Sequence, residues 1–167
     1  MTELDQEWSQ LLDAATTRAH AAGRHEVVEY LRLKASNDAI RNVGCNWLFN
    51  TFIEIAIDLQ TRRAHLEIER QEPHRFAHGS STMIGSRLNA RLGVRCLSIE
   101  AGWARTPSDG IMRSGALALS LITHFGLPRA GDELRLVHVQ SLPQWVNEEG
   151  EVVDHEFLRR HFEILVG

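Results

Sequence analysis

Cysteine and proline are scarce in this sequence, which has two cysteines and four prolines among its 167 residues. The isolated Cys45 and Cys96 supply neither a disulfide framework nor a zinc cluster. The sequence also lacks an apolar run of the ~20 residues that a membrane-spanning helix needs. Its first residues lack the basic and apolar regions of a secretory signal. We therefore expect a cytoplasmic protein with no membrane partner.

An excess of positive charge is also missing, because the formal net charge is −4 and the sequence pI is about 6.1. This balance gives no reason to expect nucleic acid as a partner. No nucleotide-binding fingerprint is present either, since the stretch 79–85 lacks the lysine of a P-loop, so the cofactor is unknown. The length and the hydrophobic share of 43% suit a single globular domain over residues 1–167.

The N-terminal part of the sequence is helical in pattern, with apolar residues at intervals of three and four. One series ends at Gly23 and the next at Gly44, where glycine can terminate a helix. We expect an N-terminal helical hairpin over residues 1–44, packed on a mixed α/β core over residues 45–167.

The core alternates between strand-like and helix-like segments. From Trp47 onward apolar residues occupy every second position, and the isoleucines favour a strand, although the same run also fits a helix. The order of segments favours a partly parallel sheet, and we expect a short exposed hairpin at Trp145. The predicted fold class is α/β (mixed α+β), with a mixed sheet of about 4–5 strands and packed helices. The expected strands are 49–59, 64–70, 94–100 and 133–140, and the expected helices are 80–92, 106–124 and a last one from Asp154.

The first candidate site is the predicted loop 74–82, which we expect to lead into the helix 80–92. The free backbone N–H groups at a helix start attract anions, and Arg75, Ser80 and Ser81 could contact such a ligand. His74 and His78 are candidates for catalysis. Their spacing brings two imidazoles together only on a helix, and the loop prediction therefore gives no metal site.

The second candidate site is the loop 100–113, between a predicted strand and a predicted helix. Glu100 lies at the carboxyl end of the strand, where α/β proteins often bind ligands. Arg105 and Arg113 could hold a carboxylate or phosphate, because a guanidinium binds such groups through two parallel hydrogen bonds.

Three functions are compatible with these candidates. The leading hypothesis is a cytoplasmic domain that binds a small anionic ligand, such as a nucleotide, phosphate or carboxylate metabolite, between the 74–82 and 100–113 loops. One alternative is a small hydrolase or lyase that uses His74 or His78 with Glu100. The other is a non-catalytic protein–protein interaction module, which would form a homodimer or bind another protein through the N-terminal helices or the Trp145 hairpin.

Overall fold

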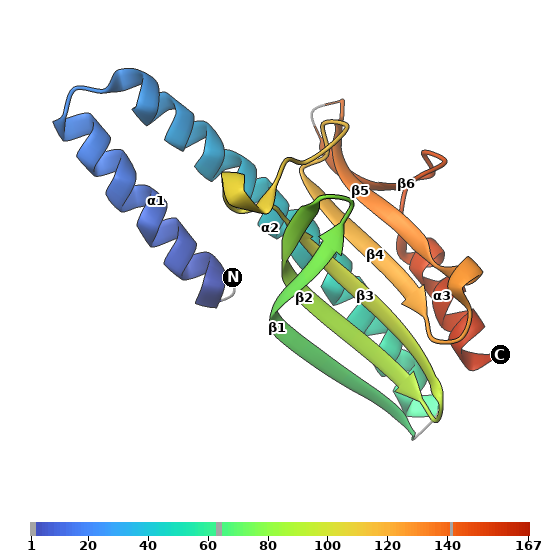
Figure 1. Cartoon of the computed structure of the whole chain (residues 1–167). Helices are drawn as coiled ribbons and strands as arrows, with labels where there is room; N and C mark the ends of the chain where they lie inside the picture. The colour runs from blue at the N-terminus through green and yellow to red at the C-terminus, as the bar shows by residue number, and fades with distance from the viewer. Residues whose placement is uncertain (1–2, 63–64, 141) are drawn as a thin grey trace. The chain divides into compact units, whose positions relative to one another are not determined.

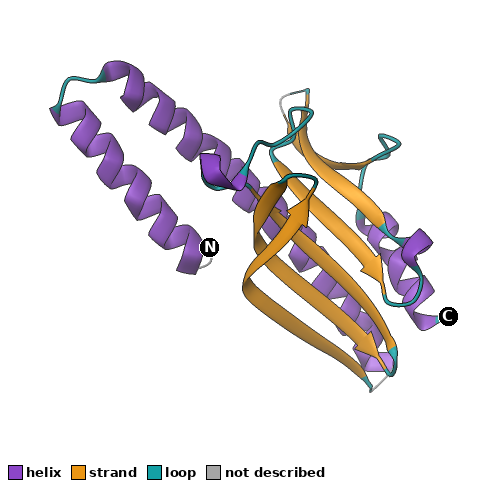
Figure 2. Ribbon diagram, viewed as in Figure 1, coloured by secondary structure: helices purple, strands orange, loops and turns teal. Residues whose placement is uncertain are grey.

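The computed structural model describes residues 3–62, 65–140 and 142–167. The chain divides into two compact units, Met1–Val43 and Gly44–Gly167. Helix α1 (Glu3–Ala21) and helix α2 (His25–Arg62) confirm the predicted N-terminal helical hairpin (Figures 1 and 2). Helix α2 continues without a break from the first unit into the second. No helix in the described part of the chain is both long enough and apolar enough to cross a membrane.

In the first unit, a buried carboxylate joins the two helices. Asp38 is 5% exposed and accepts hydrogen bonds from the indole Nε1 of Trp8 at 2.8 Å and from Nη1 of Arg41 at 2.7 Å. Two donors offset the cost of taking this charge out of water. Helix α1 ends as expected at Gly23, whose φ of 66° is one that glycine adopts without a steric penalty.

The second unit contains a six-stranded sheet in the order β1-β2-β3-β4-β5-β6. The strands are β1 (Leu66–His78), β2 (Ser81–Leu92), β3 (Arg95–Trp103), β4 (Ala118–His124), β5 (Asp132–Val139) and β6 (Leu142–Asn147).

The fold class, mixed α+β with N-terminal helices before a sheet, is confirmed, and the strand count is slightly higher than predicted. Every pairing between neighbouring strands is antiparallel, whereas the order of segments favoured a partly parallel sheet. A parallel pair needs a long crossover, usually a helix. The two segments predicted to supply such helices, 80–92 and 106–124, are not α-helical.

The C-terminal half of α2 covers one face of the sheet, which we call the inner face. The predicted strand 49–59 is therefore wrong, and Ala64, at the start of the predicted strand 64–70, lies outside the described residues. Cys45, Leu48, Phe49, Phe52, Ile55 and Ala56 are buried at intervals of three and four, which is the period of a helix. The isoleucines at every second position were a misleading signal. A buried helix face needs about three apolar residues in every seven, and a segment this rich in apolar residues also places some of them two apart.

The predicted hairpin forms, because Val146 pairs with Val152 in an antiparallel bridge and Glu148 and Glu149 make an exposed turn between them. Trp145 itself is buried and closes the packing of α2 on the sheet, so only its predicted exposure is wrong. Its ring is 2% exposed, and its Nε1 donates a hydrogen bond to the carbonyl oxygen of Gly44 at 2.8 Å. A Cβ at Gly44 would lie 2.6 Å from Cδ2 of Leu136, so helix and sheet approach closely here.

The predicted helix 80–92 is strand β2. Ile84, Leu88 and Leu92 recur every four residues, which fits a helix face and equally fits every second position on one face of a strand. The predicted helix 106–124 splits into a short 3₁₀ turn (Pro107–Asp109), a connection, and strand β4. Strand β4 is buried on both faces, and this explains its continuous apolar sequence.

Helix α3 (His155–Val166) begins at Asp154, as predicted, and the Asp154 side chain accepts a hydrogen bond from the backbone N–H of Phe157 at 2.8 Å. A buried polar chain joins α3 to the sheet. Nδ1 of His161 lies 3.0 Å from Nε2 of His124, and Nε2 of His161 lies 3.2 Å from Oδ2 of Asp132. Burial and the neighbouring His124 and Arg160 charges lower the pKa of His161 to about 4. His161 is therefore neutral at physiological pH.

Candidate functional site

A pair of glycines lets the β1–β2 hairpin bend toward the outer face of the sheet, which is the face opposite α2. His74, Gly85 and Gly102 lie side by side on β1, β2 and β3. A Cβ at Gly85 would lie 2.7 Å from Cα of Gly102, and one at Gly102 would lie 2.6 Å from the carbonyl oxygen of Ile84. Only glycine allows the two backbones to approach so closely. The register of β1 also shifts between Gln71 and His74, as at a β-bulge, which increases local twist.

The bend brings the hairpin tip over strands that are distant in the sheet. Nε2 of His78, at the end of β1, lies 2.9 Å from Oε2 of Glu133 on β5. Three strands separate β1 from β5 in the sheet order, so this contact requires the hairpin to fold over the outer face. Figure 1 shows the upper part of the β1–β2 hairpin crossing the strands behind it.

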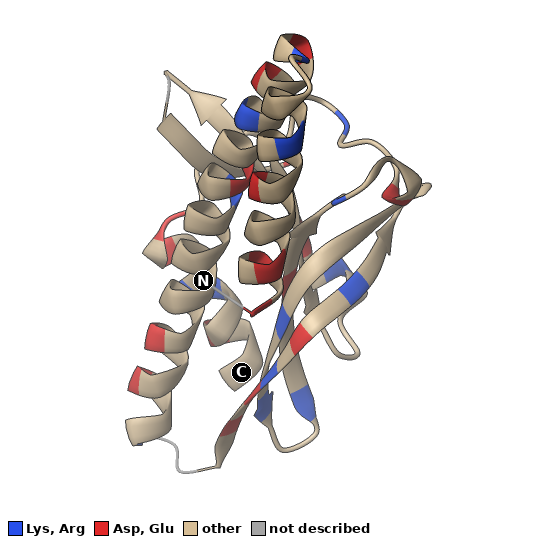
Figure 3. Ribbon diagram, turned by 90° about the vertical axis from the view of Figure 1, so that its left-hand side faces the viewer, with Lys and Arg blue, Asp and Glu red and all other residues tan. Residues whose placement is uncertain are grey.

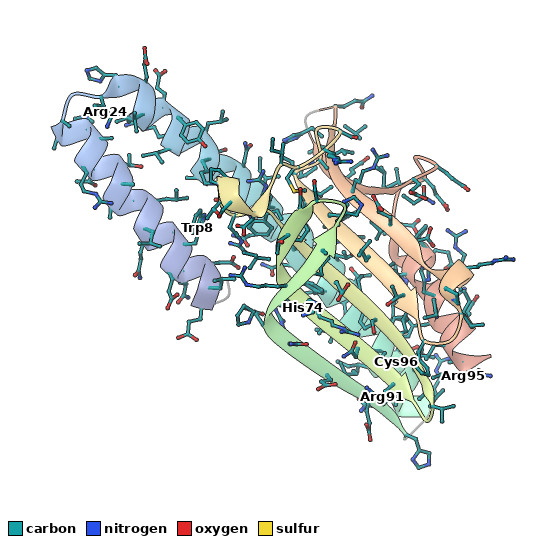
Figure 4. The ribbon with its side chains drawn as sticks, in the orientation of Figure 1. Trp8, Arg24, His74, Arg91, Arg95 and Cys96 are labelled. Carbon is teal, nitrogen blue, oxygen red and sulfur yellow. The ribbon has the colours of Figure 1, made fainter. Side chains whose placement is uncertain are left out.

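A second histidine–glutamate pair lies on the same face. Nε2 of His74 lies 2.6 Å from Oε1 of Glu100 on β3, and Nη1 of Arg87 lies 3.9 Å from the same oxygen. The two side chains are 11% and 16% exposed, so water screens this pair only in part. His74 and Phe76 also stack, with ring centroids 6.0 Å apart. Figure 4 shows His74 on the strand where the hairpin turns upward.

The folded-over hairpin and the connection before β4 enclose a pocket of about 280 Å³ on the outer face. Its apolar side belongs to a small cluster in which Phe76, Met83 and Leu119 are buried and Met112 and Leu121 pack against them. The polar side chains that line the pocket are His78, Ser81, Arg113, Ser114, Glu133, Arg135 and Glu148.

A close contact joins the two segments that form the pocket. The hydroxyl of Ser81 donates a hydrogen bond to the carbonyl oxygen of Ile111 at 3.2 Å. Gly110, with φ of 105°, passes so near that its Cβ would lie 2.8 Å from Cβ of Ser81. The 3₁₀ turn before it is fixed by Asp109, which accepts hydrogen bonds from the backbone N–H and the hydroxyl of Thr106, both at 2.9 Å. Burial alone would raise the pKa of Asp109, but these bonds lower it overall.

The structure brings together part of the predicted site. His78, Ser81 and Arg113 line the same pocket, although they come from the two separate predicted loops. The helix start expected at Ser80 and Ser81 does not exist, because Ser80 lies in an exposed two-residue turn with Gly79 and Ser81 begins β2. The anion-attracting helix dipole is therefore absent from this segment.

The other predicted residues lie outside the pocket lining. Glu100 contacts His74, as described above. Arg105 stacks on the indole of Trp103, with its guanidinium carbon 3.8 Å from the ring centroid. Arg75 is exposed.

Sequence reasoning missed Glu133, Arg135, Glu148, Met83 and Met112. The first two lie on the predicted strand 133–140 and are two residues apart, so their shared face was readable from the sequence. Their closeness to His78 was not readable, because it depends on the bend of the hairpin.

Two positively charged side chains of the pocket have no protein partner in the described part of the chain. Neither Arg113 nor Arg135 makes a side-chain hydrogen bond or ion pair with a residue that the structure describes. Glu133, by contrast, is paired with His78. Both positive and negative positions occur along the strands of the sheet (Figure 3). Among the described residues, no group of three or more His, Cys, Asp and Glu side chains is placed to hold a metal ion.

Comparisons of the chain with protein-family models, with curated proteins and with solved structures found no match.

Proposed function

We propose that the second unit binds a small ligand with an anionic group in the outer-face pocket. The observation that carries this proposal is the pair of arginines, Arg113 and Arg135, which line the pocket without an ion-pair partner among the described residues. A guanidinium stays charged at all physiological pH values and binds carboxylate or phosphate through two parallel hydrogen bonds. The hydroxyl of Ser81 and the ring of His78 supply further polar contacts at the same pocket.

The surroundings favour a bound ligand over hydrated arginines alone. Met83 and Leu119 are 2% and 3% exposed, so the pocket has an apolar floor beside its charged side chains. Ligand sites commonly combine an apolar lining with a few fixed polar groups. We also propose that the protein acts in the cytoplasm, a reducing compartment in which Cys45 and Cys96 would stay reduced. A protein partner or a homodimer stays a separate prediction.

A thermal-shift panel tests the proposal. The probes are AMP, glucose 6-phosphate, citrate and 4-methylpentanoate, each at rising concentration. A probe at 100 times its Kd adds about 2.7 kcal/mol to the free energy of unfolding, which raises Tm by roughly 5 °C or more in a domain of this size. We expect at least one probe to do so.

A charge-matched pair of double variants locates the binding. Arg113→Gln with Arg135→Gln removes both pocket charges, and we expect it to lose the shift. Arg91→Gln with Arg129→Gln removes two charges outside the pocket lining and should keep the shift. Arg91 lies near the β2–β3 turn, away from the hairpin tip (Figure 4). A panel without any shift, or a full shift in the pocket variant, contradicts the proposal.

Acid–base catalysis on the bound ligand is a second candidate. The observation in its favour is the His78–Glu133 pair, which lines the pocket and holds an imidazole against a carboxylate at 2.9 Å. A carboxylate that accepts a hydrogen bond from one ring nitrogen fixes the orientation and tautomer of the imidazole, and the other nitrogen can then exchange a proton with a ligand. The His74–Glu100 pair has the same composition but does not line this pocket. Chemical conversion of a bound probe, followed by one-dimensional proton NMR, distinguishes an enzyme from a binding domain.

A further inference from the structure

The outer-face pocket contains side chains of both charge signs. Besides Arg113 and Arg135, it is lined by Glu133 and Glu148. A ligand with only negative charge would meet attraction at the arginines and repulsion at the glutamates. The charges of the pocket therefore say more about the ligand than that it is an anion.

The strand register separates the two signs. Glu133 and Arg135 lie two residues apart on β5 and so point from the same face, roughly 7 Å apart along the strand. Leu134 pairs with Asn147 of β6, which places Glu148 beside Glu133. Arg135 instead lies between Leu119 on β4 and Val146 on β6. The carboxylates of Glu133 and Glu148 thus lie together near the start of β5, and Arg135 lies two residues further along the strand.

The carboxylates differ in their present partners. Oε2 of Glu133 lies 2.9 Å from Nε2 of His78. Glu148 is exposed and makes no side-chain hydrogen bond or ion pair with any residue in the described ranges. The carboxylate of Glu148 is therefore available to a cationic group of a ligand, whereas the carboxylate of Glu133 is bonded to His78 through Oε2.

The apolar floor and the volume limit what lies between the charged groups. Met83 and Leu119 are buried beneath the pocket, and Met112 packs against them at its side. Methionine side chains are flexible and polarizable and adapt to apolar groups of different shape. The volume of about 280 Å³ is just below the ~300–1,000 Å³ typical of sites for drug-sized ligands. A molecule of amino-acid size fits such a space better than a nucleotide.

We infer that the ligand is a zwitterion with an apolar side group, of the class of the free apolar α-amino acids. Its carboxylate contacts Arg113 and Arg135, its ammonium contacts Glu148 and Glu133, and its side chain lies on Met83 and Leu119. This inference rests on the proposed function, because it assigns the ligand class of the same pocket. It also explains why both charge signs line one small cavity.

Isothermal titration with three molecules of similar shape tests the inference. L-Leucine carries both charges, 4-methylpentanoate lacks the ammonium, and 3-methylbutylamine lacks the carboxylate. A hydrogen bond to a charged group contributes enough for about a tenfold change in affinity or more. We expect leucine to bind at least tenfold more tightly than either analogue.

Single variants assign the two ends of the ligand. Glu148→Gln should weaken leucine about tenfold and should not weaken 4-methylpentanoate, whose carboxylate it relieves of a repulsive charge, whereas Arg135→Gln should weaken both. Glu156→Gln, an exposed carboxylate on α3 outside the pocket lining, is the matched control and should change neither affinity.

The outcomes separate this inference from the proposed function. Equal affinities for leucine and 4-methylpentanoate overturn the zwitterion and leave anion binding intact. Tight binding of 3-methylbutylamine without binding of 4-methylpentanoate overturns both, because the site would then recognise a cation. No binding of the three molecules overturns the amino-acid class, while the phosphate probes of the thermal panel still decide on anion binding.

Discussion

Replacement of His161 by phenylalanine tests the energetics of the buried polar chain between α3 and the sheet. His161 is 5% exposed and lies between His124 and Asp132. Its ring also packs against Phe157, with centroids 5.4 Å apart. Phenylalanine keeps an aromatic ring of similar width at this place but has no nitrogen to bind a proton. The variant therefore removes the titration of this position and retains most of the packing.

The pKa of His161 gives the size of the effect. Burial, with the charges of His124 and Arg160, lowers it from 6.5 to about 4. Between these values the unfolded chain binds a proton that the folded chain does not, so the free energy of unfolding rises with pH. The contribution is complete above pH ~6.5 and is lost as the pH falls toward 4, at about 1.4 kcal/mol per pH unit and about 3 kcal/mol in all.

The neighbouring groups change this slope in known directions. Burial also lowers the pKa of His124, which adds to the loss of stability in acid. Burial and the carboxylates of Glu151 and Glu149 raise the pKa of Asp132, which opposes it, since the folded chain then binds a proton first as the pH falls. The contribution of Asp132 can be removed by making Asp132→Asn in both the wild type and His161→Phe. The pH dependence of stability of these two proteins then differs only through His161.

Urea unfolding between pH 4 and 8, followed by tryptophan fluorescence, measures the slope. We expect the stability of the wild type to fall more steeply with acid than that of His161→Phe, by up to about 1.4 kcal/mol per pH unit between pH 6.5 and 4. His155→Phe, at an exposed position of the same helix, should keep the wild-type slope. Equal slopes for the wild type and His161→Phe would refute the assignment of a neutral buried His161.

Two further substitutions test the packing that positions the site. Gly85→Ala puts a methyl group against the backbone of the neighbouring strand, and we expect its free energy of unfolding, measured by urea titration, to fall by more than the ~1–3 kcal/mol typical of overpacking. Gly93→Ala, where φ is 60° and no atom lies within 4 Å, should cost only about 1 kcal/mol, and equal losses would argue against a close strand approach. Phe52→Ala removes a ring that is 1% exposed and lies 4.7 Å from that of Phe162, so we expect a loss of about 3–5 kcal/mol. The half-exposed Ile57 is its control, and Ile57→Ala should lose much less in the same unfolding experiment.

The end of the first helix and the start of the last helix were predictable because local chemistry determines them. Gly23 ends the first helix by adopting positive φ, and Asp154 begins the last one by accepting from the N–H of Phe157. Both effects act within a few residues and do not depend on the rest of the fold. The strand at 95–103 was also recognisable, because apolar and polar residues alternate along it next to a glycine-containing turn.

The central segments were not predictable from periodicity alone. The spacing of Ile84, Leu88 and Leu92 satisfies a helix and a strand equally, and only the neighbouring strands decide between them. The segment 49–59 was predicted as a strand and is a helix. Isoleucines favour strands by their local preference, but here they lie on a helix that is held by its contacts with the sheet. Local preference was overridden by tertiary packing in this segment.

The site was predictable only in its separate parts. The sequence marks His78, Ser81 and Arg113 as polar residues near glycines, but their common pocket depends on the bend at Gly85 and Gly102. That bend arises from a pairing between two strands, and no single segment contains the signal for it.

Mapping of ligand contacts by NMR tests most directly whether the outer-face pocket binds a small ligand through its carboxylate. The ¹⁵N-labelled protein is titrated with L-leucine and, separately, with 4-methylpentanoate, and the shifts of the backbone amides are followed. We expect saturable shifts of the amides in 78–83, 111–116 and 133–135, and their loss in the Arg113→Gln and Arg135→Gln double variant. Shifts confined to the groove lined by Glu54, Phe162 and other residues of α2 and α3, or no saturable shift with either molecule, would contradict it.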